Sequence, residues 1–400
     1  MGSSSVLSGT RIVTPRGIVA GHIAIENGKI ASISTKAAPL LTESYDAGQN
    51  LVLAGFIDLH VHGAGGWEVG PRVESVLNMA KSLAENGTTS FYPTPPMTDI
   101  KTLCKTLKAI NDAVHTQREQ LAEGVACGAE ILGIHLEGPF LNKENKGAMA
   151  EDFLLPPELP TIQLLEKQAP NLIKRITLAP ELPGSFQLIK SLHNQGYDVA
   201  AGHTNADTNT MKKGIDAGIS IANHLFNAMR PLHHREPGAV GVCLTDDRII
   251  CEIIADGIHV HPLAIEIAIR CKGHDNLYLV SDAISAAGLP AGEYKFIGRK
   301  INVDASGVSR LEDGTIAGST SFLRDGFKLI TDSLNHDLLL ASKLTAVNPA
   351  KTAGLLSHKG TLEEGKDADI VVLDQDYSVT HSCVKGVWHK VPPTRANKTI

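Results

Sequence analysis

The sequence predicts an α/β protein, a (β/α)8 barrel of the TIM type with a small β-sandwich formed by the two ends of the chain. Compact apolar runs alternate with helical stretches through the middle of the chain, as in parallel βα units. Eight such runs, together with the helical stretches between them, extend over roughly 230 residues, which matches a (β/α)8 barrel in number and length. Both ends instead contain short strand-like runs separated by turns, which predicts the sandwich.

The N-terminal segment contains the short runs RIVTP and GIVAGHIAIENGKIASIS. Within the second run, Asn27-Gly28 is a typical two-residue hairpin turn. The C-terminal segment shows the same pattern of short strand-like runs separated by turns in GTLEEGKDADIVVLD and VKGVWH. We expect residues 1–54 and 357–400 to fold together as the small sandwich domain, and residues 55–356 to form the barrel domain.

The barrel elements are expected in a regular order. The strands should be Val52–His62, Thr88–Thr94, Ile131–Gly138, Ile176–Glu181, Asp198–Thr204, Ser220–Asn227, Ile250–His259 and Leu277–Ala283. The main helices between them should be Val73–Asn86, Ile100–Glu123, Thr161–Gln168, Phe186–Gln195, Thr208–Ala217 and Pro262–Gly273. Further helices should follow to about Leu356, and Glu293–Gly318 is predicted as a hairpin insertion after the last strand.

The composition describes a globular chain without a broad charged surface. Its 400 residues are 42% hydrophobic, and 37 basic residues against 43 acidic residues give a net charge of −6. Because charges of both signs are scattered, we expect neither nucleic acid nor a membrane as a partner. The longest clean apolar run, Leu51 to Ile57, is far too short to span a bilayer.

Two features predict a cytoplasmic location. The start MGSSSV lacks the basic and apolar regions of a secretory signal. The six cysteines are far apart in the sequence, with no C-x-x-C pair, so we expect reduced thiols.

Polar side chains stand at the carboxyl ends of most expected strands, the face on which the βα loops of a barrel build a site. Each interrupts or ends an apolar run, where an unpaired buried polar group costs about 1–3 kcal/mol. Imidazoles and carboxylates converging there suit a divalent metal, zinc or iron, with an open position for water. The residues are His60, His62, Glu137, His203, His224, His259 and Asp282.

Several of these residues also have ordinary structural explanations. His60 and His62 share one face of a strand, but such pairs are common without a metal. The alternative for Glu137 is a buried salt bridge, although no arginine or lysine lies nearby in sequence. Asp282 suits a general base beside metal-bound water, and its alternative is a helix cap. His259 has the alternative of a core histidine.

Two further groups of polar residues accompany the metal candidates. His135 shares a strand face with Glu137, which makes it a candidate hydrogen-bond partner of a ligand. The loop after the sixth strand suggests recognition of an anionic substrate group, because arginine donates two parallel hydrogen bonds to phosphate or carboxylate. The alternative is a solvated loop. The cluster is Asn227, Arg230, His233, His234 and Arg235.

Missing motifs narrow the chemistry further. The chain contains no G-x-x-x-x-G-K-[ST], no dinucleotide-binding fingerprint and no G-x-S-x-G. These absences disfavour nucleotide phosphoryl transfer and serine hydrolysis. Metal-assisted hydrolysis is the favoured chemistry.

At these residues the sequence resembles the amidohydrolase superfamily, and within it the N-acetylglucosamine-6-phosphate deacetylase family. The resemblance runs from about residue 10 to residue 375. HLEGPF and NHLFNAM with REPG are specific to the deacetylases, whereas His-x-His and the tail motif are shared across the superfamily. The matching strings include LAGFIDLHVHGAGG, GIHLEGPFLN, AGHTNA, NHLFNAMRPLHHREPG, ADGIHVHP, LVSDAISAAG, GTIAGS and KGTLEEGKDADIVVLD.

The resemblance implies a barrel with a small β-sandwich, usually as a homodimer, that hydrolyses N-acetylglucosamine 6-phosphate to glucosamine 6-phosphate and acetate in amino-sugar recycling. It implies that Glu137, His203 and His224 hold the principal divalent metal. Asp282 would be the general base that later acts as the acid, and His259 would polarise the acetamide carbonyl.

The resemblance also assigns substrate contacts. Arg235 resembles the arginine that reaches the phosphate, in the family from the neighbouring subunit. The other implied contacts with the substrate are Ala148, Asn227, Ala228, Ile316, Ala317 and Gly318.

The chain departs from the family pattern in two places. Some members have amides instead of the first two histidines and use one metal, whereas His60 and His62 retain the option of a second. Many members have a histidine where this chain has Met149, which puts sugar recognition in question.

Two alternative functions remain. Another amidohydrolase would act on a cyclic amide, a nucleobase or an acylated amino acid, often with a carbamylated lysine at the end of strand four. Here that strand ends Ala179-Pro180-Glu181. From another class, the chain would be a non-catalytic barrel that serves as an assembly scaffold.

Overall fold

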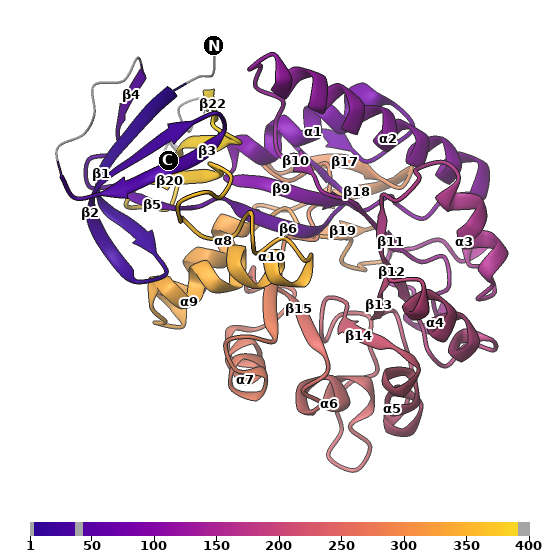
Figure 1. Ribbon diagram of the computed structural model, residues 1–400. Coiled ribbons are helices and arrows are strands. Elements are labelled where there is room, and N and C mark those ends of the chain that lie inside the picture. Colours follow the sequence, from indigo (N-terminus) through magenta and orange to yellow (C-terminus); the bar gives the residue numbers. More distant parts are fainter. Residues whose placement is uncertain (1–3, 37–42, 391–400) are drawn as a thin grey trace.

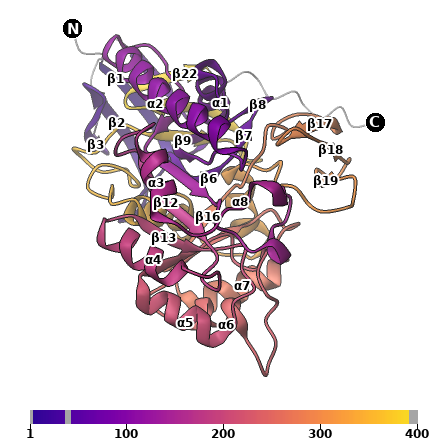
Figure 2. The same ribbon diagram turned by 90° about the vertical axis from the view of Figure 1, so that its right-hand side faces the viewer.

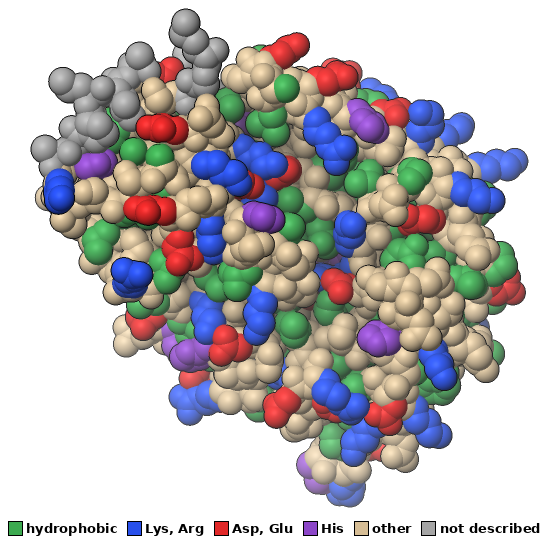
Figure 3. Space-filling view, in the orientation of Figure 1, with side chains coloured by type: hydrophobic (Ala, Val, Ile, Leu, Met, Phe, Trp, Pro, Cys, Tyr) green, Lys and Arg blue, Asp and Glu red, His purple; other side chains and the backbone are tan. Residues whose placement is uncertain are grey.

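The structure is a computed structural model that describes residues 4–36 and 43–390. Residues 1–3, the first part of the segment expected to lack a signal, lie outside the described residues, as do residues 37–42 and 391–400 of the predicted sandwich. Within the described part, no helix is long and apolar enough to cross a membrane. Figure 3 shows acidic and basic side chains interspersed over one face of the molecule.

All eight predicted barrel strands are present as parallel strands. Because the third predicted strand is split into β10 and β11, they form nine strands: three in one sheet, in the order β10-β9-β6, and six in a second sheet from β11 to β16. The strands are β6 (Phe56–Val61), β9 (Thr88–Pro93), β10 (Glu130–Ile131), β11 (Ile134–Glu137), β12 (Ile173–Leu178), β13 (Asp198–Ala201), β14 (Ile219–Ala222), β15 (Ile250–Ile254) and β16 (Leu277–Val280). Because parallel strands point the same way, their carboxyl ends lie on one face.

Two predicted strands are divided in the structure. Val52–His62 is interrupted at Gly55, where a Cβ would lie 2.2 Å from the side chain of Thr89. Its first half, β5 (Leu51–Ala54), leaves the parallel sheet and joins strands from the chain ends. The third predicted strand is split between β10 and β11.

Helices cover the outside of the parallel strands (Figures 1 and 2). All six predicted helices are present. Asp99 and Asp207 explain two of the helix starts, because each side chain accepts hydrogen bonds from backbone N–H groups of the first turn. The helices along the parallel strands are α1 (Val73–Glu85), α2 (Ile100–Ala122), α3 (Leu159–Glu166), α4 (Ser185–Asn194), α5 (Thr208–Ala217), α6 (Gly238–Thr245) and α7 (Pro262–Lys272). Trailing helices are α8 (Leu323–Lys328), α9 (Leu338–Ser342) and α10 (Asn348–Thr352).

The two ends of the chain pair in one eight-stranded sheet, where indigo and yellow strands lie side by side in Figure 1. The contact is antiparallel, with Ala54 opposite Ile370. The predicted hairpin turn is confirmed, since Asn27 and Gly28 both have positive φ, 52° and 76°. The strands are β1 (Ser4–Thr14), β2 (Gly17–Glu26), β3 (Lys29–Ser34), β4 (Glu43–Asp46), β5, β20 (Ile370–Leu373), β21 (Val379–Val384) and β22 (Val387–Lys390).

The terminal sheet is buried on both faces where it meets the rest of the molecule. Leu51 and Leu53 of β5 pack into the main hydrophobic core, whereas Val52 and Ala54 pack into a second core between the terminal strands. Along β20, Val371 and Leu373 likewise pack into the main core, whereas Ile370 and Val372 pack into the second core. The division into residues 1–54 with 357–400 and residues 55–356 stays a prediction.

The predicted insertion is a three-stranded antiparallel sheet. It consists of β17 (Gly292–Phe296), β18 (Arg299–Val303) and β19 (Ser309–Leu311). A short hairpin of β7 (Gly63–Ala64) and β8 (Trp67–Glu68) lies beside it (Figure 2). Both follow parallel strands, β6 and β16, at their carboxyl ends, so they stand at the face predicted to carry the site.

Candidate active site

The predicted polar residues converge in one pocket of about 330 Å³ at the carboxyl ends of the strands. Glu137 ends β11, and His60 and His62 lie at the end of β6. The pocket is lined by His62, Glu137, Gly147, Ala148, Met149, His203, His224, Asn227, Ala228, His259, Asp282, Phe296, Thr315, Ile316 and Gly318.

Glu137 lies at the centre of the site. Its Oε1 is 3.0 Å from His203 Nε2 and 2.9 Å from His224 Nε2. Its Oε2 is 3.3 Å from His62 Nε2. Oε1 therefore faces His203 and His224, whereas Oε2 faces His62.

Backbone carbonyls fix the rings of two of these histidines. His203 Nδ1 is 2.8 Å from the carbonyl oxygen of Asn145, and His62 Nδ1 is 2.9 Å from that of Thr94. Because a carbonyl oxygen only accepts, each Nδ1 carries the proton. In the neutral ring, Nε2 then has a lone pair directed into the site, the form that ligates a metal.

The donor set fits a divalent metal. Ligand atoms of Glu137, His203 and His224 lie within 4.8 Å of one another, as do those of His60, His62 and Glu137. Among the described residues, His60 Nε2 and Glu137 Oε2 are buried without a hydrogen-bond partner. Neutral imidazoles and a carboxylate are common ligands of zinc and iron. Glu137 belongs to both of these candidate groups.

Electrostatics at the site favour positive charge. Burial opposes protonation of His60 and His62, yet Glu137 and Asp282 hold the pKa of His60 well above its usual value and raise that of His62 to about 9. Burial would raise the pKa of Glu137, but His60 and His203 hold it well below its usual value. The same negative field that favours charged imidazoles favours a bound cation.

Asp282 and His259 stand at the rim of the cluster. Asp282 Oδ1 is 3.2 Å from His62 Nε2, and hydrogen bonding to His62, against the effect of burial, lowers the pKa of Asp282. His259 Nδ1 donates to Asp256 Oδ2 at 2.7 Å, so Nε2 is the ring nitrogen left for the pocket. Against burial, Asp256 raises the pKa of His259.

Three site residues adopt a backbone conformation that side chains disfavour. His203, His224 and Asp282 have φ of 48°, 26° and 49°. Each lies two residues past the end of its strand. Such conformations cost about 1–3 kcal/mol each and persist mainly at functional sites.

The predicted substrate contacts are brought together only in part. Ala148, Asn227, Ala228, Ile316 and Gly318 line the pocket, as does the divergent Met149, whereas Ala317 is buried outside the lining.

Arg235 lies outside the pocket of its own chain, on the loop between β14 and α6 that projects from the body of the molecule (Figure 2). It is exposed and donates to His234 Nε2 at 2.9 Å. Arg230 donates to Asn205 instead. The polar cluster predicted on this loop is therefore divided, with only Asn227 of its five members in the pocket.

The structural alternatives proposed for Glu137, a buried salt bridge, and for Asp282, a helix cap, are wrong. Within the described part of the chain, Glu137 has no ion pair with arginine or lysine, only contacts with histidines and Asn223. No helix begins at Asp282, since the next element is β17. His135 does not bond Glu137 as predicted; its ring nitrogens contact Leu59 O at 3.2 Å and Thr177 Oγ1 at 2.7 Å.

Sequence reasoning missed several residues of the site. Asn223 donates to Glu137 Oε1 at 3.0 Å, and its position beside His224 was the available signal. Phe296 lines the pocket from the insertion and packs edge-on against His62. Nothing local in the sequence connects Phe296 with a histidine so far away along the chain.

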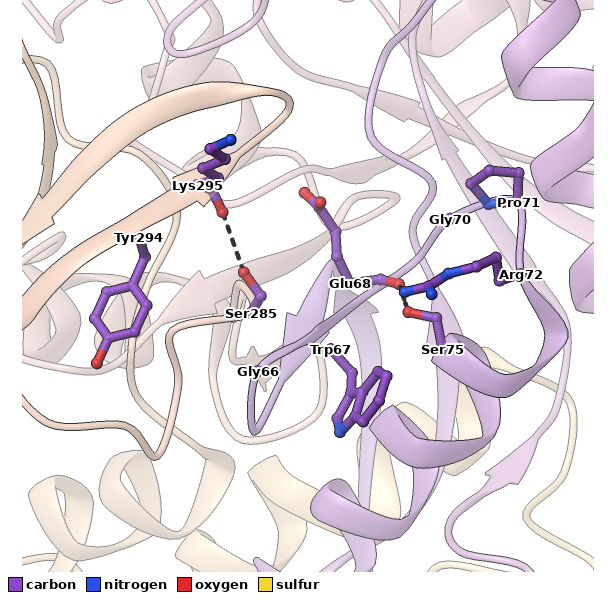
Figure 4. Close-up of a pocket in the computed structure, with 10 residues that line it drawn as sticks. All are labelled: Gly66, Trp67, Glu68, Gly70, Pro71, Arg72, Ser75, Ser285, Tyr294 and Lys295. Carbon is purple, nitrogen blue, oxygen red and sulfur yellow. Dashed lines mark hydrogen bonds between the residues drawn. The ribbon is translucent and has the colours of Figure 1, made fainter.

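A second cavity, of about 390 Å³, lies between the β7–β8 hairpin and the insertion (Figure 4). The Glu68 carboxylate accepts a hydrogen bond from Ile297 N at 3.2 Å, which ties the insertion to β8. Lys295 lines this cavity while its neighbour Phe296 lines the site pocket, so β17 contributes to both. The remaining lining is Gly66, Trp67, Gly70, Pro71, Arg72, Ser75, Ser285 and Tyr294.

Comparisons with known proteins agree with this geometry. The amidohydrolase family pattern matches residues 51–394. An N-acetylglucosamine-6-phosphate deacetylase of Bacillus subtilis is 36% identical, covering 96% of this chain and 97% of the relative. An N-acetylgalactosamine-6-phosphate deacetylase of Escherichia coli O157:H7 is 33% identical, and the match covers 95% of this chain and 98% of the relative.

The fold comparison agrees with the sequence comparison. A mutant N-acetyl-D-glucosamine-6-phosphate deacetylase from Mycobacterium smegmatis, solved in complex with N-acetyl-D-glucosamine-6-phosphate, superposes with a TM-score of 0.87 at 30% identity. The match covers 97% of this chain and 99% of that one. The chain therefore belongs to the amidohydrolase family and, within it, to the N-acetylglucosamine-6-phosphate deacetylases.

Proposed function

We propose that the protein hydrolyses the acetamide of N-acetyl-D-glucosamine 6-phosphate to D-glucosamine 6-phosphate and acetate, in amino-sugar catabolism. The observation that carries this proposal is the cluster of Glu137, His203 and His224 beside Asp282 in one pocket. Relatives that match nearly the whole chain are named as deacetylases of this sugar phosphate.

A divalent metal, zinc or iron, would be held principally by Glu137, His203 and His224, and a second site would lie at His60 and His62. When bound, such a metal lowers the pKa of a coordinated water to about 7 and polarises a substrate oxygen. The nitrogen and carboxylate donors suit either ion.

The chain's own residues supply the proton transfers. Asp282, whose pKa is lowered, is ionised and accepts a proton as water attacks the N-acetyl carbon. It then gives that proton to the departing amine nitrogen, so acetate and the free amine form with no other reactant. His259, whose pKa is raised, donates to the carbonyl oxygen as negative charge develops there.

We further propose that the parallel strands close into a (β/α)8 barrel, with the small sandwich domain attached. Backbone hydrogen bonds between the first and last strand regions support closure: Asp282 N donates to His60 O at 3.0 Å, and His62 N to Ala283 O at 2.8 Å. Leu132 N donates to Phe91 O and Ile134 N to Leu172 O, which links the two sheets through residues 130–134.

Phosphate recognition is proposed to require a homodimer in which Arg235 reaches the pocket of the neighbouring subunit. Its position on a projecting loop, outside its own pocket, supports this. Apolar side chains exposed nearby in the sequence and on α7 offer a contact surface: Leu232 is 52% exposed, Leu263 67% and Ile267 53%. Sedimentation of Leu263→Glu, expected to be monomeric beside a dimeric wild type, tests it.

The phosphorylated substrate and six free thiols fit a cytoplasmic location.

The function is tested by acetate release from the purified, metal-analysed protein. We expect rapid release from N-acetylglucosamine 6-phosphate, little from unphosphorylated N-acetylglucosamine, and loss of release after chelation with recovery on adding metal. Equal use of both sugars would overturn the phosphate contact. No release with metal bound would overturn the substrate assignment.

N-acetylgalactosamine 6-phosphate is a second candidate substrate, favoured by the Escherichia coli relative named for it. The same assay with this epimer decides between them. Cyclic amides are disfavoured because the fourth strand leads to Glu181, which accepts from Thr204 Oγ1 and Asn205 N, rather than to a lysine in the cluster.

A further inference from the structure

A network of charged and polar side chains is buried beneath the metal cluster, and the proposed chemistry does not use it. Arg175 of β12, Glu252 of β15 and Tyr278 of β16 are each 0% exposed. Arg175 donates to Glu252 Oε1 and, at 2.6 Å, to Tyr278 Oη. Tyr278 Oη donates to Glu252 Oε1 at 2.7 Å.

Stability alone does not explain this network. Barrel interiors are normally filled by branched apolar side chains. Replacing a buried ion pair by apolar residues of similar volume is often neutral or stabilising, because both charges must be removed from water. The network therefore requires a reason other than packing.

The contacts of Glu252 supply that reason. While Arg175 and Tyr278 hold Oε1, the other oxygen, Oε2, lies 3.5 Å from His60 Nδ1. At the opposite side of the same ring, His60 Nε2 faces Glu137 Oε1 and Asp282 Oδ1, each at 3.5 Å. Glu252 is thus placed to accept the Nδ1–H of His60 and leave the Nε2 lone pair for the site.

His135 cannot take this role. Its ring packs edge-on against His60, with centroids 4.5 Å apart, and both of its nitrogens already have partners. Among the described residues, Glu252 provides the only acceptor within hydrogen-bond distance of His60 Nδ1.

We propose that Glu252 is a positioning residue for His60, held in place by Arg175 and Tyr278, and that this contact sets how tightly the second site at His60 and His62 binds its cation. Carboxylates that accept from the non-ligating nitrogen of a histidine fix its tautomer and orientation, and their loss weakens metal binding about 10–100-fold. The inference rests on the proposed function, because it concerns the metal centre of the same pocket.

The test is a titration of the chelated, metal-free full chain with Co²⁺ or Zn²⁺, followed by calorimetry and metal analysis without substrate. Wild type should take up two equivalents. The double variant Arg175→Met with Glu252→Leu removes the two fully buried charges together. Asp198, which Arg175 also contacts at 3.5 Å, has a side chain that is 34% exposed and stays hydrated. We expect its second equivalent to bind about 10–100-fold more weakly while the first is unchanged.

Tyr278→Phe is an intermediate variant. It removes one of the two hydrogen bonds that hold Glu252 Oε1 but leaves Arg175 in place and Oε2 facing His60, so the second equivalent should weaken less than in the double variant. Glu252→Gln provides a second variant, to be used if the double variant does not fold, and it should also weaken only the second equivalent.

The proposal is overturned if wild type takes up one equivalent only, or if the folded double variant and Glu252→Gln bind two with wild-type affinity. Neither result depends on acetate release. A deacetylase that binds one metal would overturn the role of Glu252 alone, whereas two bound metals without deacetylation would overturn the proposed function alone.

Discussion

Glu137 and Asp282 show how two carboxylates in one pocket come to different proposed roles. The Glu137 side chain is 1% exposed and is surrounded by imidazole nitrogens, which suits a permanent metal ligand. The Asp282 side chain is 12% exposed and lines the pocket beside His62. A group that exchanges protons with substrate needs that access, and its lowered pKa keeps it ionised and ready to accept.

Replacing Asp282 by Asn tests this division. The amide cannot accept the proton, so kcat should fall by about two to four powers of ten. The principal metal should stay bound as in the wild type, because Asp282 is outside the cluster of Glu137, His203 and His224. Acetate release and metal analysis measure the two effects, and Asp313→Asn, on the exposed insertion, is the control. An active Asp282→Asn enzyme would remove Asp282 from the mechanism.

At the scale of elements, strand ends and the segments that follow them form the site. The insertion places Phe296 against His62. Arg299 of the insertion donates to the Ala148 carbonyl at 3.2 Å, which joins the insertion to the segment that lines the pocket at Ala148. The tight hairpins elsewhere depend on glycine. Gly28 occupies a left-handed position in the β2–β3 turn and lies directly against the backbone of Lys385.

Gly28→Ala should destabilise the protein by about 1–3 kcal/mol, the usual cost of backbone strain in this region. Two effects combine, since φ is +76° and the added Cβ would lie 2.8 Å from the Lys385 carbonyl oxygen. Gly48→Ala is the matched control, with φ of +56° but no atom of the described residues within 4 Å. Urea unfolding measures both, and an equal loss in the two variants would contradict the close contact as a cause.

At the scale of the whole molecule, a buried group of ion pairs joins the terminal sheet to the parallel sheet. Lys359 Nζ lies 2.7 Å from Glu130 Oε2, beside β10, and 3.1 Å from Asp367 Oδ2. Lys385 of the tail also pairs with Glu130. The Lys359 side chain is 4% exposed, so its charge is balanced by carboxylates from both parts of the chain.

Lys359→Met should destabilise the protein by about 3–5 kcal/mol, because it leaves buried carboxylates without their partner. Burial opposes ionisation of Glu130 and Asp367, yet lysines lower the pKa of both, so their contribution is present at neutral pH and lost as the pH falls. The difference between wild type and variant should therefore shrink as the pH falls below about 4.

Urea unfolding at pH 7 and at pH 3 measures that difference. Lys300→Met is the control, because Lys300 pairs with Glu293 on the exposed insertion and should change stability little. A Lys359→Met variant as stable as wild type at pH 7 would show that the ion pairs do not hold the two parts together.

Local patterns in the sequence determine much of the fold. The eight strands and six helices are predicted from contiguous residues, because apolar runs, periodicity and caps such as Asp99 and Asp207 are encoded locally. Helix α6 is not among the predicted helices, since residues 238–244 are buried all round and so show no amphipathic period.

The order of residues along the chain predicts which side chains stand at the carboxyl ends of strands, and hence the candidate metal ligands. Only the tertiary structure decided that Glu137 faces two groups of histidines, that Arg235 lies outside its own pocket, and that Arg175 pairs with Glu252. Arg175 and Glu252 are 77 positions apart. The reason is geometric, because the order of residues fixes which end of a strand a side chain occupies, whereas the packing of separate strands fixes what it meets.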